Sequence, residues 1–88
     1  MFPCRSHGAE AQAKGLMNGL KGLNHGKIWI DVEENPSPGC SWASHTKSSN
    51  CEYIVSLIHA LKKEGANVGV YTSEYEWSLV VGSRGACH

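Results

Sequence analysis

The stretch Lys27-Ile-Trp-Ile-Asp-Val-Glu33 indicates the fold class of this chain. It has the composition of a β-strand, in which successive side chains point to opposite faces. One face is apolar and β-branched, as packing under helices requires: Ile28, Ile30 and Val32. The other face carries Trp29, Asp31 and Glu33, so two carboxylates lie at the C-terminal end of the strand. In parallel α/β sheets, active sites form at this end.

The segment before this strand predicts a helix over residues 8–24, with Leu and Met at helical spacing and three weakening glycines. A loop of about 16 residues with two prolines follows the strand. Residues 51–64 form the strongest predicted helix, with an apolar stripe that ends at Leu61. Ser49 or Asn50 is the expected N-cap and Gly65 the expected C′ residue.

A second strand is predicted over residues 67–73, and Ser73 is expected to cap a short helix that ends near Gly82. The order is therefore strand end, helix, strand, helix, strand, helix. This order predicts βαβ units, a parallel sheet and right-handed crossovers. We expect an α/β protein in which residues 1–88 form a single, partial domain.

The carboxylates of Asp31 and Glu33 face the same space, because two residues of strand separate their α-carbons by roughly 6.6 Å. Like charges at this range raise one pKa, so one group can hold a proton near neutral pH. A protonated carboxyl beside an ionised one is the equipment of glycoside hydrolysis. We expect Glu33 to be the acid and Asp31 to stay ionised. Spacing alone leaves the alternative of two ordinary surface acids open.

Aromatic residues near the acids are candidates for sugar binding. Trp29 shares the acid face of its strand, and Tyr71 is expected to point from the second strand toward the carboxylates. Trp42 lies in the loop after the first strand, where binding and packing are equally good interpretations. Trp77 is expected to pack its helix onto the sheet.

Residues 27–42 closely resemble the glycoside hydrolase family 25 lysozymes, particularly the invertebrate branch. Residues 68–73, followed by Trp77, look like the fifth barrel strand and its helix of that family, and Phe2-Pro3-Cys4 looks like the tail of the third. The resemblance implies a segment of a (β/α)₈ TIM-type barrel, about strands three to five with their helices. It implies an N-acetylmuramidase that cleaves β-1,4 bonds of bacterial peptidoglycan without a cofactor, with Glu33 as proton donor and Asp31 assisting.

The same resemblance implies a secreted, lysosomal or digestive parent protein in antibacterial defence or peptidoglycan catabolism. A complete barrel takes about 250 residues. We therefore expect the 88 residues to be a truncated piece that is inactive alone. The alternative is a non-catalytic product that binds glycans or protein partners.

The bulk composition excludes other classes of function. Eight Lys and Arg balance eight Asp and Glu. The near-zero net charge gives no electrostatic reason to expect nucleic acid or an acidic membrane surface. No window approaches the roughly 18 apolar residues of a membrane span, and the N-terminal residues contain no apolar run of signal-peptide length.

Four cysteines in a short chain suggest disulfides, with free buried thiols as the alternative. Their spacing matches no common zinc pattern, so we expect no metal site. Chain direction places Cys40 and Cys51 on the same side of the sheet as the acids, and we predict a bridge between them. Cys4 should share that side. Cys87 should lie near the opposite one, so that both are free or paired with other segments.

Overall fold

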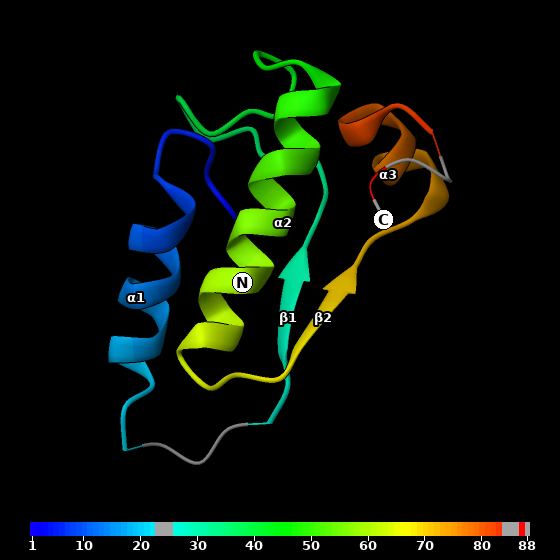
Figure 1. Cartoon of the computed structure of the whole chain (residues 1–88). Helices are drawn as coiled ribbons and strands as arrows, with labels where there is room; N and C mark the ends of the chain where they lie inside the picture. The colour runs from blue at the N-terminus through cyan, green and yellow to red at the C-terminus, as the bar shows by residue number, and fades with distance from the viewer. Residues whose placement is uncertain (23–25, 84–86, 88) are drawn as a thin grey trace.

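The computed structural model describes residues 1–22, 26–83 and 87. It is a mixed α/β structure in which two parallel strands alternate with helices (Figure 1). The elements are, in order, α1 (Ala9–Gly19), β1 (Ile28–Asp31), α2 (Lys47–Lys63), β2 (Val68–Tyr71) and α3 (Glu74–Val81). The expected alternation and the parallel pairing are confirmed. Among the described residues, no helix is long and apolar enough to cross a bilayer.

The two strands pair in parallel from Ile28 opposite Val68 to Asp31 opposite Tyr71. Both C-terminal ends therefore lie at the same end of the sheet, where the loop after β1 and helix α3 also begin (Figure 1). The other edge of β1 receives the start of the chain. The Met1 nitrogen donates to the Trp29 carbonyl at 2.5 Å, and the Asp31 N–H donates to the Met1 carbonyl at 2.8 Å. This alternation is that of a parallel strand pair, as expected for the end of a preceding strand.

The expected division of β1 into two faces is confirmed. Ile28, Ile30 and Val32 are buried, whereas Trp29 is exposed. Helix α2 packs against α1 and α3, and its apolar stripe enters the same core as the buried face of β1. The core members from α2 include Ile54, Leu57 and Leu61. The opposite face of the sheet, which carries the acids, has no helix over it among the described elements.

Helix α2 begins earlier than the sequence suggested. Its N-cap is Thr46, whose hydroxyl accepts a hydrogen bond from the Ser49 N–H at 3.0 Å. The prediction of Ser49 or Asn50 as N-cap is therefore wrong, because both lie inside the helix and use their side chains in tertiary contacts. The C-terminal prediction is confirmed, since Gly65 follows the cap with a φ of 92°.

The other two helices differ in how well they were predicted. Helix α1 ends at Gly19, several residues before the expected end at Asn24, and residues 23–25 lie outside the described part of the chain. Helix α3 is as expected. The Ser73 hydroxyl caps its first turn, and Gly82, with a φ of 104°, follows its last residue.

The predicted Cys40–Cys51 disulfide is wrong. The structure pairs Cys4 with Cys40 and Cys51 with Cys87, with α-carbons 4.2 and 5.4 Å apart. Cys4 does lie on the expected side of the sheet, but it faces the loop after β1 directly. Helix α2 begins before Cys51, so this cysteine lies more than one turn into the helix. Cys87 packs against the core beside α2 rather than at the opposite end of the sheet.

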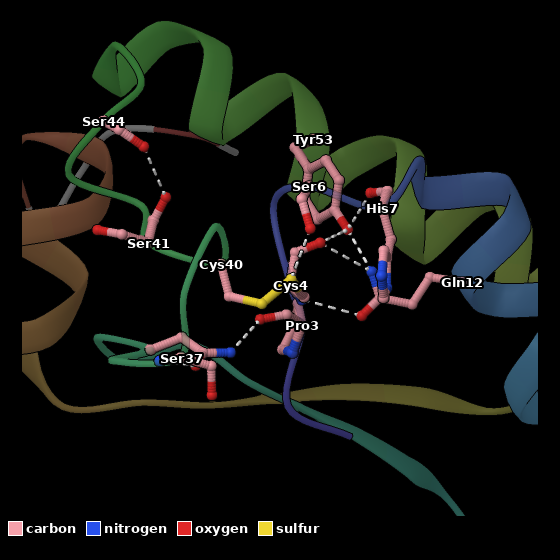
Figure 2. Close-up of a disulfide and its surroundings, with 11 residues drawn as sticks. Pro3, Cys4, Ser6, His7, Gln12, Ser37, Cys40, Ser41, Ser44 and Tyr53 are labelled. Atoms are coloured by element: carbon pink, nitrogen blue, oxygen red, sulfur yellow. Dashed lines mark hydrogen bonds between the residues drawn. A yellow bond between two sulfur atoms is a disulfide. The ribbon is translucent and has the colours of Figure 1, made fainter.

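Figure 2 shows the Cys4–Cys40 bridge and the polar contacts around it. The Gln12 side chain donates to the Tyr53 hydroxyl at 2.5 Å and accepts from the Cys4 N–H at 3.0 Å. The Arg5 N–H donates to the Cys40 carbonyl at 3.4 Å. Together these bonds and the disulfide fix the loop after β1 to the start of the chain and to α1 and α2.

Candidate active site

The two candidate acids lie where the sequence placed them. Asp31 is the last residue of β1 and is half-buried, and Glu33 follows two residues later and is exposed. By strand alternation the two residues share one face of the chain, opposite to the face of the buried Ile30 and Val32. Thr72, just after β2, donates its hydroxyl proton to the Val32 carbonyl at 2.6 Å. This bond ties the backbone between the two acids to the neighbouring strand.

The surroundings of Glu33 favour its protonated form. The charge of Asp31 is the largest cause of the raised pKa of Glu33. Partial loss of solvation, a side-chain hydrogen bond with Asp31 and the charge of Glu76 raise the pKa of Glu33 further. Because the two carboxyls lie close together, Glu33 binds a proton more readily than an isolated glutamate does.

Asp31 has an unused acceptor. Its Oδ1 atom is buried and has no hydrogen-bond partner among the described residues. A buried carboxylate oxygen without a donor costs free energy, and such atoms in native structures call for an explanation. A hydrogen-bond donor to this oxygen would therefore be stabilising.

Trp29 and Tyr71 lie on the open face beside the acids. Tyr71 is directly across from Asp31 in the sheet and is 66% exposed. Trp29 is 51% exposed, and its indole extends over Gly69, where an added Cβ would lie 2.6 Å from the ring. The Lys27 ammonium lies 5.1 Å from the ring centroid. Both aromatic side chains are thus accessible to a ligand on this face.

Trp42 requires a correction, because it is not available to a sugar. Its side chain is 1% exposed and packs edge-to-face on Tyr53, with ring centroids 5.8 Å apart. Its indole N–H donates to the Glu33 carbonyl at 2.9 Å. The packing interpretation holds, and the contact with Glu33 gives Trp42 a structural role at the site.

Two residues near the site were not recognised from the sequence. The Glu76 carboxylate accepts a hydrogen bond from the Glu34 N–H at 3.1 Å. Asn50 is buried and donates to the carbonyls of Trp42 at 3.1 Å and Val80 at 2.9 Å. The spacing Ser73-x-x-Glu76 is a capping-box pattern, so it marks Glu76 as a helix residue and conceals its contact with the loop after β1.

Two hollows lie on the described surface. One lies between α1 and α2, with Glu10, Lys14 and His59 among its lining residues. The other lies between β2 and α3 and is lined in part by Val70 and Trp77. Neither Asp31 nor Glu33 is among the lining residues of these two hollows.

Comparison with known proteins identifies the family. The family model described as "Lysozyme-like protein 1" matches residues 1–88, the whole chain. The chain belongs to this lysozyme-like family. The resemblance to family 25 lysozymes is thereby confirmed, since relatives with that name match over most of the chain.

Three relatives illustrate the range of the lysozyme-like matches. "Probable GH family 25 lysozyme 2" of Dictyostelium discoideum is 42% identical over 85 residues, which cover 93% of this chain and 37% of the relative. "Probable GH family 25 lysozyme 3" of the same organism is 46% identical over 70 residues, covering 80% of this chain and 14% of the relative. "Lysozyme-like protein 1" of Caenorhabditis elegans is 34% identical over 74 residues, covering 82% and 23%.

The lysozyme-like chain thus spans little more than a third of the first of these relatives, and less of the other two. No solved structure matches it significantly. Family membership is established by sequence, and the geometry described above is that of the matched segment.

Proposed function

We propose that this chain is the acid-bearing segment of a lysozyme-type glycoside hydrolase that cleaves β-1,4 bonds in bacterial peptidoglycan. One observation supports this most strongly. Glu33, at the C-terminal end of a parallel strand, lies beside Asp31, and the charge of Asp31 is the largest cause of the raised pKa of Glu33. That pair is the chemical requirement for glycosidic bond cleavage.

In this proposal each acid has a distinct role. Glu33 donates its proton to the glycosidic oxygen as the bond to the anomeric carbon breaks. Asp31 stays ionised and stabilises the positive charge that develops at that carbon, or orients the acetamido group of the substrate. The position of Asp31 at the end of β1, two residues before the exposed Glu33, supports this role. The exposed Trp29 and Tyr71 provide aromatic surface for sugar rings.

The wider architecture is also part of the proposal. We propose that residues 1–88 are one partial domain and correspond to about strands three to five of a (β/α)₈ barrel. The parallel pairing of β1 with β2, and of Met1 with β1, supports this arrangement. A barrel of about 250 residues has an interior filled by its own strands, and the uncovered acid face is where further strands would pack. A secreted or lysosomal location and a role in antibacterial defence or digestion fit this activity.

A second candidate is a non-catalytic function derived from a lysozyme. "Counting factor 50" of Dictyostelium discoideum, whose name does not describe an enzyme, is 36% identical over 77 residues, covering 85% of this chain and 24% of that protein. A protein that contains a segment similar to this one is therefore not always named as an enzyme. Under this alternative the exposed aromatic face would bind glycans or a protein partner without cleavage.

A chimera tests the catalytic proposal. The matched segment of the Dictyostelium lysozyme 2 relative is replaced by this chain, and turnover of insoluble peptidoglycan is measured by release of reducing sugar. We expect hydrolysis by the chimera and a loss of about 10²- to 10⁴-fold in Glu33→Gln, the usual contribution of general acid catalysis. The unmodified relative is the control for assay and fold.

The outcomes separate the two candidates. A chimera that folds and hydrolyses, with more than a tenth of its turnover left after Glu33→Gln, would contradict the role of Glu33. A folded chimera that binds peptidoglycan but releases no sugar, beside an active parent, would favour the non-catalytic function. Purified residues 1–88 alone are expected to show no measurable hydrolysis, because the sheet has open edges and an uncovered face.

A further inference from the structure

One peptide group at the site is held from two sides. The carbonyl of Glu33 and the N–H of Glu34 belong to the same peptide unit, and the described chain contains no cis peptide bond. In a trans peptide these two groups point in opposite directions. The carbonyl accepts from the Trp42 indole at 2.9 Å, and the N–H donates to Glu76 Oε2 at 3.1 Å.

The two partners of this peptide come from rigid parts of the structure. Trp42 is 1% exposed and packs on Tyr53 of α2. Glu76 is half-buried in the first turn of α3, whose N-terminus is capped by Ser73. Rotation of the peptide after Glu33 would therefore break bonds to two separately anchored elements.

The direction of the Glu76 side chain is informative. In a capping box, the glutamate three residues after the N-cap bonds to the N-cap N–H of its own helix. Here, within the described residues, the hydrogen bond of the Glu76 carboxylate is to Glu34 on the loop after β1. A side chain that would usually serve α3 is thus used to join α3 to the acid site.

We propose that Glu76 is a positioning residue for Glu33: with Trp42 it fixes the 33–34 peptide and so directs the Glu33 carboxyl toward the scissile bond. This inference rests on the proposed function and adds to it a third carboxylate that does not touch the reacting atoms. Glu76 also acts through its charge, because it is one of the groups that raise the pKa of Glu33. Asp31 on β1 is the other charged group that does so.

Three variants of the 88-residue chain separate the hydrogen bond from the charge. Glu76→Gln keeps an acceptor for the Glu34 N–H but removes the charge. Glu76→Ala removes both. Glu74→Gln is the matched control, because it removes a charge from the same helical turn but from a residue that is not among the groups acting on Glu33.

The readouts are NMR titration of the Glu33 carboxyl and hydrogen exchange of the Glu34 amide. In Glu76→Gln we expect the pKa of Glu33 to fall toward its ordinary value while Glu34 exchange stays within about twofold of wild type. In Glu76→Ala we expect the same fall in pKa and Glu34 exchange about tenfold faster. Glu74→Gln should change neither quantity.

The proposal is overturned if Glu76→Ala folds, as judged by its amide spectrum, and leaves Glu34 exchange as in wild type. It is also overturned if Glu74→Gln produces the same changes. If Glu76→Ala does not fold, Glu76→Asp decides, because it keeps the charge but shortens the side chain that reaches the Glu34 N–H: Glu34 exchange as in wild type would then overturn the proposal. These readouts need no hydrolysis. An inactive chimera beside faster Glu34 exchange in Glu76→Ala would therefore refute the function alone, and an active chimera beside unchanged Glu34 exchange would refute the positioning role alone.

Discussion

At the scale of single residues, the site places two like charges next to each other at the cost of some stability. Glu33 is exposed, and its pKa is raised chiefly by the charge of Asp31, followed by partial loss of solvation, a side-chain hydrogen bond with Asp31 and the charge of Glu76. The folded chain therefore binds a proton at Glu33 more tightly than the unfolded chain does. Such strain between charges is typical of functional sites rather than of ordinary surface acids. The raised pKa of Glu33 can be measured without an activity assay.

Glu33→Gln is expected to change the pH dependence of stability. Folding raises the pKa of Glu33 above its ordinary value of 4.5. As the pH rises through the window between that ordinary value and the raised one, ionisation of Glu33 lowers the free energy of unfolding. Below the window both states are protonated and the effect vanishes. The variant should therefore gain stability relative to wild type at pH 7 and show no such gain at pH 3, in urea denaturation followed by circular dichroism. Glu52→Gln, on the exposed side of α2, is the control, and equal behaviour of the two variants would contradict the raised pKa.

Gly69→Ala is expected to displace the Trp29 indole. The added Cβ would lie 2.6 Å from the ring, but the ring is half exposed and can rotate away, so the loss of stability should be about 1 kcal/mol. Lys27, above the same ring, should lose the ring-current shift of its side-chain protons. Gly15→Ala, with no atom near its added Cβ, is the control and should stabilise α1 by about 0.5–1 kcal/mol. Unchanged Lys27 shifts in Gly69→Ala would show that the indole does not cover Gly69.

At the scale of elements, the strands and the order of elements followed from local patterns, whereas the anchoring contacts did not. Alternation in β1 separated the buried Ile30 from Asp31, and the cap at Ser73 was legible because it uses adjacent residues. Asn50 resembles an N-cap in sequence, yet it bonds to residues 8 and 30 positions away. Glu76 likewise bonds 42 positions away. Such contacts depend on how the helices pack, which periodicity and capping signals do not encode.

Asn50→Ala is expected to destabilise the chain by about 3 kcal/mol, because two buried carbonyls lose their donor. Those carbonyls belong to Trp42 and Val80, so the loop after β1 and the end of α3 should loosen together. Ser49→Ala is the matched control. Arg5 donates a hydrogen bond to the side chain of Asn50 and another to that of Ser49. Both substitutions therefore remove a bond to Arg5, but Ser49 is the more exposed of the two, so its replacement should cost about 1 kcal/mol or less. Urea denaturation measures both, and equal losses would mean that Asn50 does not link these elements.

At the scale of the whole molecule, two disulfides supplement a small core. A two-stranded sheet with helices on one face buries little apolar surface, and small domains of this kind commonly depend on covalent links. The Cys4–Cys40 bridge joins the start of the chain to the loop after β1, and the Cys51–Cys87 bridge joins α2 to the end. The sequence supplied the number of cysteines but not the pairing, because pairing depends on where each helix starts and on the position of Cys87 beside α2.

The two bridges should contribute similarly to stability, because both have a sequence separation of 36. The chain-entropy relation gives about 4 kcal/mol for a loop of this length. The double variants Cys4→Ser/Cys40→Ser and Cys51→Ser/Cys87→Ser are each expected to lose about that much in urea denaturation, and reduction of both bridges should unfold the chain. Removal of the first bridge should also increase hydrogen exchange at Glu34, because it releases the loop beside the acid site. Removal of the second should leave exchange there nearer to wild type. Peptide mapping without reduction checks the pairing itself, and a Cys40–Cys51 peptide in the oxidised chain would contradict both the pairing and the anchoring of the loop.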